Sequence, residues 1–545
     1  MHNSTIKSFK LFVFLKQEFL FKLNIWTITT FLLGLFIFLP MAEILWSFTS
    51  PSSNWTHLKE TVLFSYLSNS LILITGTVLF SLFFGISCAW IISAYNFRFR
   101  NIFEWILVLP LAIPTYISAY AYFDILELFN PLLVWIRTNI NFETMQSVNN
   151  FLVYLVTILV MASVLYPYIY LLARASFIRQ GKQLSDAART LGHNNKSIFW
   201  KIALPMARPA IVAGVSLVIM ETLNDYGAVE HFGIPTLTTG IFRTWLGMGD
   251  LTGALRLSAT VMILIFFVII IEKKLRSGSK YHELVNSKPL SDKIPLQKNK
   301  SIIAIICCSI PLMFGFVIPI SRLISWAWIS RSIASDIVGI ELIVNSLGLA
   351  MITSLGTVII AIILVFSARY FKSAITYFSN RLAILGYSIP GAVIAIGMLL
   401  FSGQVNYLTN YVLTGTLSLL IFAYIVRFLA VAWQPINAGI ESNCDSLNQA
   451  SQTLGTSTFR SLTRVNLPLI KDTILTAALL VFIDIVKELP LTLILRPFNF
   501  ETLSTATFDL SSQAQIVESS IPALSIIIMV LAPLIFLNYH LENSK

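Results

Sequence analysis

Charged residues are scarce in this chain, and that scarcity limits what the protein can be. Asp, Glu, Lys and Arg make up 12% of the 545 residues, whereas hydrophobic residues make up 56%. A soluble protein of this length needs far more charge on its surface, so the composition excludes a soluble protein and predicts a multi-span membrane protein. Cysteine is also scarce. Its four residues have no paired spacing, which indicates neither disulfide bonds nor a zinc or redox site.

Long apolar runs are abundant, and a helix needs about 20 such residues to cross the hydrocarbon core of a membrane. Twelve runs fit this requirement. The predicted spans are 26–48, 66–94, 102–123, 150–173, 209–228, 256–271, 301–329, 341–367, 382–402, 411–433, 473–490 and 521–538. No small-residue cleavage site precedes the first run, so we expect the first helix to remain as an anchor.

The basic residues predict the orientation of the spans, because Lys and Arg in short loops tend to stay in the cytoplasm. If the chain starts inside the cell, 28 of its 37 Lys and Arg residues fall in segments on the cytoplasmic side. We therefore expect both termini in the cytoplasm. The net charge of +11 is explained by these loops and needs no nucleic-acid partner.

The chain contains an internal repeat. Residues 186–205 align with residues 449–468 at an offset of 263, which superimposes Thr-Leu-Gly and Leu-Pro in the two copies. Two shorter pairs, Asn-Ser at 69 and 345 and Ile-Pro at 113 and 389, align at an offset of 276. Six predicted spans per copy is an even number, so we expect two parallel halves related by a pseudo-twofold axis along the membrane normal.

This repeat predicts the organisation of the chain. The first half covers 1–271 and contains the repeated loop at 180–206, and the second half covers 301–545 and contains the loop at 443–469. The stretch 272–300, with eight basic residues, is interpreted as a cytoplasmic linker. A basic loop that faces lipid is the alternative interpretation.

The repeated loop follows the fourth predicted span of each half. In the first copy, Ala187 and Ala188 lead to Gly192, which suits a helix end, and Pro205 lies just before the next span. We predict a short helix, a turn and a second helix. An element present twice at one spacing suits docking onto two copies of a cytoplasmic partner, and an ordinary pair of interfacial helices is the alternative.

The spacing within this loop resembles that of ATP-binding cassette importer permeases: Glu-Ala-Ala, three residues, Gly, nine residues, Ile, one residue and Leu-Pro. The first copy has Asp in place of Glu, and the second copy is more divergent. The resemblance implies a coupling helix that sits in a groove of an ATPase subunit. The matching positions are Asp186, Ala187, Ala188, Gly192, Ile202, Leu204 and Pro205, and then Gln449, Ala450, Gly455, Val465, Leu467 and Pro468.

Two further segments, 221–233 and 487–505, look like the corresponding segments of fused ferric-iron importer permeases. Fused thiamine permeases and polyamine permeases are the alternatives. The resemblance implies an all-α integral membrane protein of the type I importer permease fold, with about twelve helices, in a bacterial inner membrane. It also implies the partners, which are two ATPase subunits, a periplasmic or extracellular substrate-binding protein and membrane lipid. No nucleic-acid partner is expected.

Charge within a membrane span is costly and usually functional, and five charged residues of the predicted spans are candidates for a functional site. Glu221 and Asp225 are four residues apart, so we expect them on one helix face. The offset of 263 places them on Asp484 and Glu488, with Lys487 between those two acids. These residues would line a substrate path, because hard cations favour oxygen ligands. The alternative is a set of ion pairs, with Lys487 pairing Asp484 or Glu488. No metal site is identified.

The chain has no phosphate-binding loop of the form GxxxxGK[S/T], so we expect no cofactor and no enzymatic activity here, with ATP bound by the partner subunits. A secondary transporter driven by an ion gradient is the main alternative, because it also combines twelve spans in two parallel halves. That class does not predict the doubled loop. A membrane-embedded enzyme is a third interpretation, which no motif supports.

Overall fold

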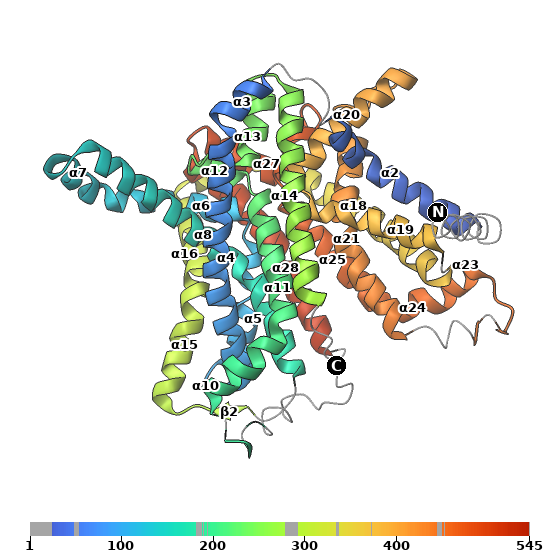
Figure 1. Cartoon of the computed structure of the whole chain (residues 1–545), viewed down its shortest axis with the longest axis horizontal. Helices are drawn as coiled ribbons and strands as arrows, with labels where there is room; N and C mark the ends of the chain where they lie inside the picture. The colour runs from blue at the N-terminus through green and yellow to red at the C-terminus, as the bar shows by residue number, and fades with distance from the viewer. Residues whose placement is uncertain are drawn as a thin grey trace, which may run out of the picture. The chain divides into compact units, whose positions relative to one another are not determined.

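The computed structural model of the chain is built almost entirely of helices (Figure 1). It describes residues 24–543, apart from 48–53, 181–187, 189, 193, 278–292, 334–336, 372, 444–449 and 452. Within these residues, ten helices are long and apolar enough to cross a membrane. They cover Ile25–Ile44, Leu63–Ala94, Phe142–Arg179, Lys196–Asn224, Leu251–Leu275, Lys298–Ile329, Ile340–Tyr370, Gly391–Thr409, Leu417–Glu441 and Ile516–Leu537.

Two of the twelve predicted spans differ from the structure. The span predicted at 102–123 is a pair of helices, Arg100–Ala112 and Thr115–Ala121, bent by 92° at the Ile-Pro break. The span predicted at 473–490 is α25 (Lys471–Val486), whose 16 residues are too few to cross the core as a straight helix. The described chain therefore has ten such spans, or eleven if the bent pair is one span. The prediction of twelve was too high because apolar composition continues across points where the backbone leaves the helix.

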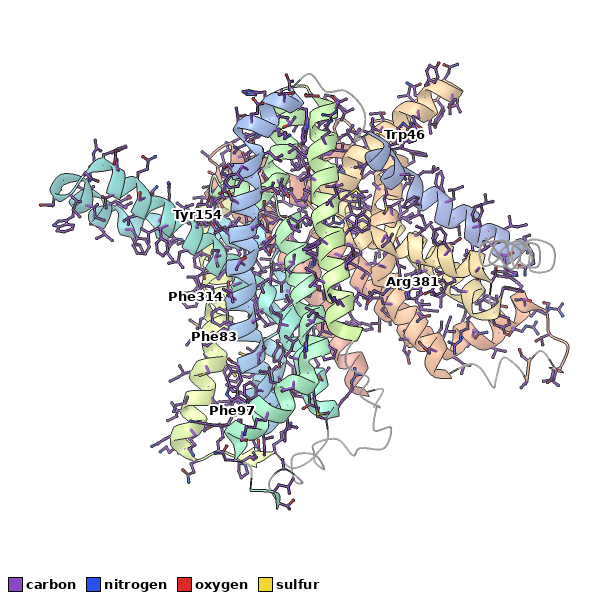
Figure 2. The ribbon with its side chains drawn as sticks, viewed as in Figure 1. Trp46, Phe83, Phe97, Tyr154, Phe314 and Arg381 are labelled. Atoms are coloured by element: carbon purple, nitrogen blue, oxygen red, sulfur yellow. The ribbon has the colours of Figure 1, made fainter. Side chains whose placement is uncertain are left out.

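One compact unit consists of residues 51–339 and 504–531. Its centre is formed by α4 (Leu63–Ala94), α8 (Phe142–Arg179) and α11 (Leu204–Asn224), which pack along one another. A Cβ atom on Gly85 of α4 would lie 2.9 Å from the Cβ of Ile169 of α8, so the small residue allows these helices to approach closely. Away from the core, large apolar side chains such as Phe83 are exposed, as expected for contact with lipid (Figure 2).

The other elements of this unit are short helices, two strands and further spans. They are α3 (Trp55–Thr61), β1 (Tyr95–Asn96), α5 (Arg100–Ile106), η1 (Leu109–Ala112), α6 (Thr115–Ala121), η2 (Phe123–Phe129), α7 (Asn130–Asn139), α10 (Asn195–Ile198), η3 (Phe199–Ala203), α12 (Gly227–His231), α13 (Leu237–Phe242), η4 (Arg243–Gly247), α14 (Leu251–Ser277), β2 (Ile294–Pro295), α15 (Lys298–Leu312), η5 (Met313–Val317), α16 (Ile318–Ile329), η6 (Arg331–Ile333), most of α27 (Leu503–Ser512) and the first part of α28 (Ile516–Asn543). β1 and β2 pair in parallel.

The second compact unit consists of residues 1–50, 340–503 and 532–545. Its centre is formed by α18 (Ile340–Tyr370), α21 (Leu417–Asn443) and α25, and the Ser354 hydroxyl of α18 donates to the Ala478 carbonyl of α25 at 2.7 Å. The other elements are α2 (Ile25–Ser47), α19 (Ala374–Ala383), η7 (Ile384–Ser388), α20 (Gly391–Thr409), α23 (Thr458–Ser461), η8 (Leu462–Asn466), α24 (Leu467–Leu469) and α26 (Pro490–Leu495).

The first helix of each predicted half packs within the unit that contains most of the other half. The rings of Trp26 in α2 and Phe366 in α18 are 5.3 Å apart, and those of Phe36 in α2 and Phe422 in α21 are 4.4 Å apart. In the other unit, the Tyr122 hydroxyl donates to the carbonyl of Phe314 in η5 at 2.6 Å. The halves 1–271 and 301–545 therefore describe the sequence repeat and stay a prediction. In the folded chain, the first helix of each half packs with helices of the other half.

The repeat reappears as a set of hydrogen bonds. In the first copy, the Asn69 side chain donates to the Pro235 carbonyl at 2.8 Å, and the Ser70 hydroxyl accepts from the Leu237 amide at 3.1 Å. These bonds hold the backbone at the start of α13 and satisfy one of its unpaired amides.

The second copy makes the same pair of bonds in its own unit. The Asn345 side chain donates to the Glu501 carbonyl at 3.2 Å, and the Ser346 hydroxyl accepts from the Leu503 amide at 2.8 Å. The start of α27 is therefore held as the start of α13 is, and the two Asn-Ser pairs recognised in the sequence have the same structural role.

Candidate functional site

A buried carboxylate joins two helix breaks in the first copy of the repeat. The helix before Pro114 ends with Ile113 in an extended conformation, and α6 begins at Thr115. At the second break, α11 ends at Asn224 and Asp225 is extended, with ψ 127°. The Asp225 carboxylate accepts from the Thr115 hydroxyl and, at 2.9 Å, from the Ala228 amide of α12. One side chain therefore fixes both breaks.

This geometry corrects the expectation that Glu221 and Asp225 share one helix face. The Asp225 amide still donates to the Glu221 carbonyl at 3.1 Å, so the last turn of α11 is complete. Asp225 then leaves the helix, because its carboxylate serves as an acceptor for the first turn of α12. Glu221 remains on α11 and is half-buried.

The second copy places Glu488 in the corresponding position. α25 ends at Val486, and α26 begins at Pro490. The buried Glu488 carboxylate lies 3.3 Å from the Arg427 guanidinium (Oε2 to Nη2) and accepts from the Leu491 amide at 3.3 Å. Arg427 also donates to the carbonyl of Ile389, the extended residue before Pro390. The same two breaks are joined, here through an ion pair.

The difference between the copies follows from one position. Thr115 corresponds to Gly391 at the offset of 276, and each is the first residue of the helix after the break. A Cβ atom on Gly391 would overlap Glu488 Oε1 and would lie 2.7 Å from Arg427 Nη1. Glycine therefore leaves the space in which the ion pair of the second copy is packed.

The other two predicted path residues of the second copy also form an ion pair. Lys487 Nζ lies 2.9 Å from Asp484 Oδ1, and both side chains are partly exposed, at 20% and 17%. Asp484 and Glu221 correspond in the repeat, and each precedes the carboxylate of its helix break by four residues. The ion-pair alternative is therefore present in the second copy, where Lys487 pairs with Asp484 and Glu488 pairs with Arg427.

The described parts of the repeated loops have the predicted turn. Gly192 and Gly455 have φ values of +83° and +75°, the left-handed conformation that ends a helix and that glycine adopts most easily. The leucine before each glycine is exposed, at 80% for Leu191 and 82% for Leu454. Asp186, Ala187 and Gln449 lie outside the described residues.

The remaining loop positions also correspond in the two copies. Ala188 is buried, as is Ser451, its counterpart at the offset of 263, and Ala450, the counterpart of Ala187, is exposed. The later positions lead from a wide helical turn into the next helix. They are Ile202 in η3 and Leu204 and Pro205 at the start of α11, and Val465 in η8 and Leu467 and Pro468 at the start of α24.

A family model matches the chain twice, at residues 81–273 and 358–543. Its description is "binding-protein-dependent transport system inner membrane component". The chain belongs to this family. Each match contains one repeated loop and one of the helix breaks with a buried carboxylate, so the two matched segments correspond to the two copies of the repeat. The chain is therefore a fused inner membrane component of such a transport system.

Curated relatives of this inner membrane component include permease proteins. It is 27% identical over 480 residues to an Fe(3+)-transport system permease protein of Haemophilus influenzae, covering 87% of this chain and 89% of the relative. It is 27% identical over 217 residues to a probable molybdenum ABC transporter permease protein of Haloferax volcanii, covering 39% and 76%. It is also 27% identical over 146 residues to the sulfate transport system permease protein CysT of Escherichia coli, covering 27% and 50%.

Sequence reasoning missed two residues of the helix breaks in this membrane component. Arg427 is a cation inside an apolar run, and that position alone marks it as a residue with a partner. Thr115 has a weaker signal, since it is marked only by its place after Pro114 in the repeat. Among the described residues, no group of three or more His, Cys, Asp or Glu side chains could hold a metal ion.

Proposed function

We propose that this chain is the translocation subunit of an ATP-binding cassette importer that moves ferric iron across a bacterial inner membrane. The observation that carries the proposal is the doubled loop, in which an exposed leucine precedes a left-handed glycine at the same position of each copy. Two ATPase subunits would each receive one loop, and an external binding protein would deliver the substrate. The chain itself is proposed to be a non-enzymatic subunit with ATP bound by its partners.

The proposed substrate rests on the breadth of one similarity. The Fe(3+)-transport relative is matched over nearly its whole length and nearly the whole of this chain, whereas the molybdenum and sulfate relatives are matched over smaller parts of this chain. Oxyanion uptake is the second candidate, because these partial relatives are matched at the same 27% identity.

The exposed leucines support the proposed coupling. A leucine with four-fifths of its surface exposed has apolar area that association with a partner would bury. The coupling residues are those of the two loops, and we propose that both loops and both termini lie in the cytoplasm. This orientation follows from the basic residues of the loops.

The intramembrane charges have two proposed roles. Both oxygens of Asp225 and both oxygens of Glu488 already interact within the protein, so we propose that these acids hold the helix breaks beside the substrate path. Glu221, Asp484 and Lys487 are partly exposed, and we propose that they face the path directly. The Glu221→Gln and Asp484→Asn double variant is expected to reduce uptake severalfold without lowering the amount of protein in the membrane.

The first experiment is uptake of labelled ferric iron by cells with and without the chain. The ferric substrate would be supported if deletion abolishes iron uptake and if excess thiamine, putrescine or molybdate does not reduce iron uptake by wild-type cells. Intact iron uptake with a lost molybdate, thiamine or polyamine signal would exclude iron and leave the importer architecture. Inactivating the partner ATPase should also abolish uptake, and persistence of ion-gradient-driven uptake would instead favour a secondary transporter.

A further inference from the structure

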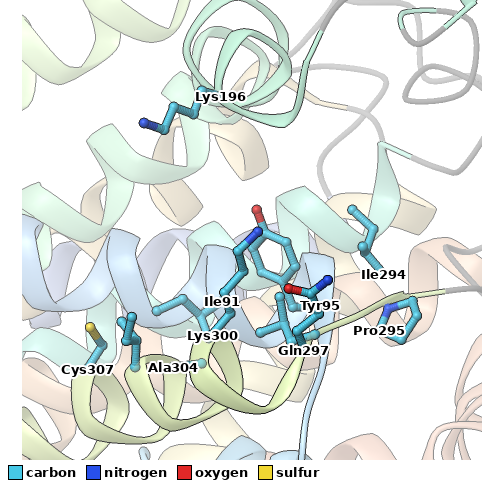
Figure 3. A pocket seen from close by; sticks show the side chains of 11 residues that line it. Ile91, Tyr95, Lys196, Ile294, Pro295, Gln297, Lys300, Ala304 and Cys307 are labelled. Atoms are coloured by element: carbon cyan, nitrogen blue, oxygen red, sulfur yellow. The ribbon is translucent and has the colours of Figure 1, made fainter.

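A cavity of about 480 Å³ lies where the linker meets the first copy of the repeat. It is formed by the end of α4, by the segment from β2 into α15, and by α10 within the first repeated loop. In the close view, Lys196 lies on one side of the cavity, and Tyr95, Gln297 and Lys300 lie on the other (Figure 3). This volume is in the range that holds a ligand of drug size.

The polar wall of the cavity lies at the ends of two spans, and the apolar wall lies farther along one of them. Lys196 is the first residue of the span Lys196–Asn224, and Lys300 is the third residue of the span Lys298–Ile329. The apolar wall includes Ile303 and Cys307, which lie farther inside the second of these spans. Cations at the ends of the spans above an apolar wall match the arrangement of a lipid, with its headgroup at the interface and its chains in the core.

The charges favour an anion. Among the described residues, no Asp or Glu lines the cavity, and neither Lys196 nor Lys300 forms an ion pair. The surroundings add further positive charge, because in the part of the chain that the structure describes Arg100 and Arg174 share one carboxylate, that of Glu104.

Lys293, at the start of the described linker segment, lies close enough to Arg100 and Arg174 to be affected by their charges. Burial, and then the charges of Arg100 and Arg174, lower the pKa of Lys293 to about 8. β2 begins at the next residue and pairs with β1, so this positive region is attached to the wall of the cavity. An anion bound there would reduce the repulsion among the cations.

The apolar wall favours a lipid over a free anion. Ile303 is 59% exposed and Cys307 is also exposed, so this side of the cavity opens toward the region of the bilayer. A free phosphate would leave the apolar wall uncovered, whereas an acyl chain would cover it. Basic pockets between membrane helices at the cytoplasmic face are known to bind anionic lipid headgroups.

We propose that this cavity binds one anionic phospholipid, whose phosphate lies between Lys196 and Lys300 and whose acyl chain covers Ile303 and Cys307. The two lysines come from different parts of the chain: α10 lies within the first repeated loop, and α15 begins at the end of the linker. The lipid therefore links the first repeated loop to the first span of the second half, and the anionic lipid of the membrane stabilises that connection.

The test compares the full chain, purified in detergent, with and without added phosphatidylglycerol. Thermal stability of the wild type should rise with phosphatidylglycerol and should not rise with phosphatidylcholine. The double variant Lys196→Gln, Lys300→Gln should bind phosphatidylglycerol more weakly, by roughly fivefold for each cation removed. The matched control is Lys201→Gln with Lys298→Gln, which removes two exposed lysines from the neighbouring turns of the same segments and should respond as the wild type does.

Cys307 provides a second measurement at the site itself. In a Cys444→Ser background, alkylation of the exposed Cys307 by N-ethylmaleimide should slow when phosphatidylglycerol is added, while Cys88 and Cys308 are buried and should react slowly throughout. Equal protection by inorganic phosphate would overturn the lipid assignment in favour of a free anion. An unchanged alkylation rate, or equal lipid responses of the two double variants, would overturn the site.

Discussion

The ion pair between Arg427 and Glu488 gives a prediction that separates a structural pair from an incidental contact. Both side chains are buried, at 6% and 5% exposure. Replacing Arg427 with Met removes the cation that lies opposite the buried Glu488 carboxylate, which still accepts from the Leu491 amide. Removing one partner of a buried pair costs about 3–5 kcal/mol, because the other charge is left without compensation. The double variant Arg427→Met, Glu488→Gln removes both charges and should unfold close to the wild type.

The assay is thermal unfolding of the purified full chain, arranged as a double-mutant cycle. For units of roughly 150–250 residues, each kcal/mol shifts the Tm by about 2–4 °C. Arg427→Met should therefore lower the Tm by roughly 6–20 °C, and the second substitution should restore most of this loss. Arg381→Met is the matched control, because it removes an exposed arginine in the same unit and should shift the Tm by little.

The cycle has a clear refuting outcome. The two single variants should be non-additive by about 2 kcal/mol or more, since the groups are in direct contact. If Arg427→Met melts with the wild type, or if the single effects simply add, then the pair does not hold the helix break and the reasoning is wrong.

Three further predictions test the backbone and the linker. Gly391→Ala should destabilise the chain, since its Cβ would overlap Glu488, whereas Gly403→Ala in the same helix has no atom within 4 Å and should leave the Tm unchanged or slightly raised. Replacing both Gly192 and Gly455 with Val should abolish uptake but not membrane insertion, because a positive φ costs a Val residue about 1–2 kcal/mol at each site. Asn tolerates that conformation and should retain more uptake, so equal loss with Asn and Val would contradict this account. Lys293 has a pKa of about 8 in the folded chain and a higher one, 10.5, when unfolded, so the unfolded state binds more protons between these pH values and the free energy of unfolding should rise with pH there. The variant Lys293→Met should lose this rise, and a rise of equal size in the variant would exclude Lys293 as its source.

Much of the fold could be predicted from the sequence, because hydropathy and the repeat are local or periodic signals. The left-handed turn at Gly192 was visible for the same reason, since a glycine after a short helical segment is a local pattern. The ends of α11 and α25 were not visible, because apolar composition continues past them. What ends these helices is a carboxylate that accepts a backbone amide three residues later, a competition that hydropathy does not record.

The partners of the intramembrane charges depended on contacts between distant residues. The offset of 263 pairs Asp225 with Glu488, yet it does not show that a threonine interacts with one acid and an arginine with the other. Arg427 lies 61 residues before Glu488, on a different helix, and no spacing rule connects them. The exchange of the first helices was equally hidden, because an apolar helix carries little information about which neighbour it packs against.

The exchanged first helix has a consequence for how the protein is made. α2 is complete once residue 47 has been synthesised, whereas its packing partner α19 begins at residue 374. At a translation rate of about 5–20 residues per second, α2 must remain in the bilayer for roughly 15–65 seconds before that partner exists. A ribosome that stalls in the linker would leave α2 without its neighbours and the first half without α15 and α16, so the fused chain can reach its native packing only after most of the second half has been inserted.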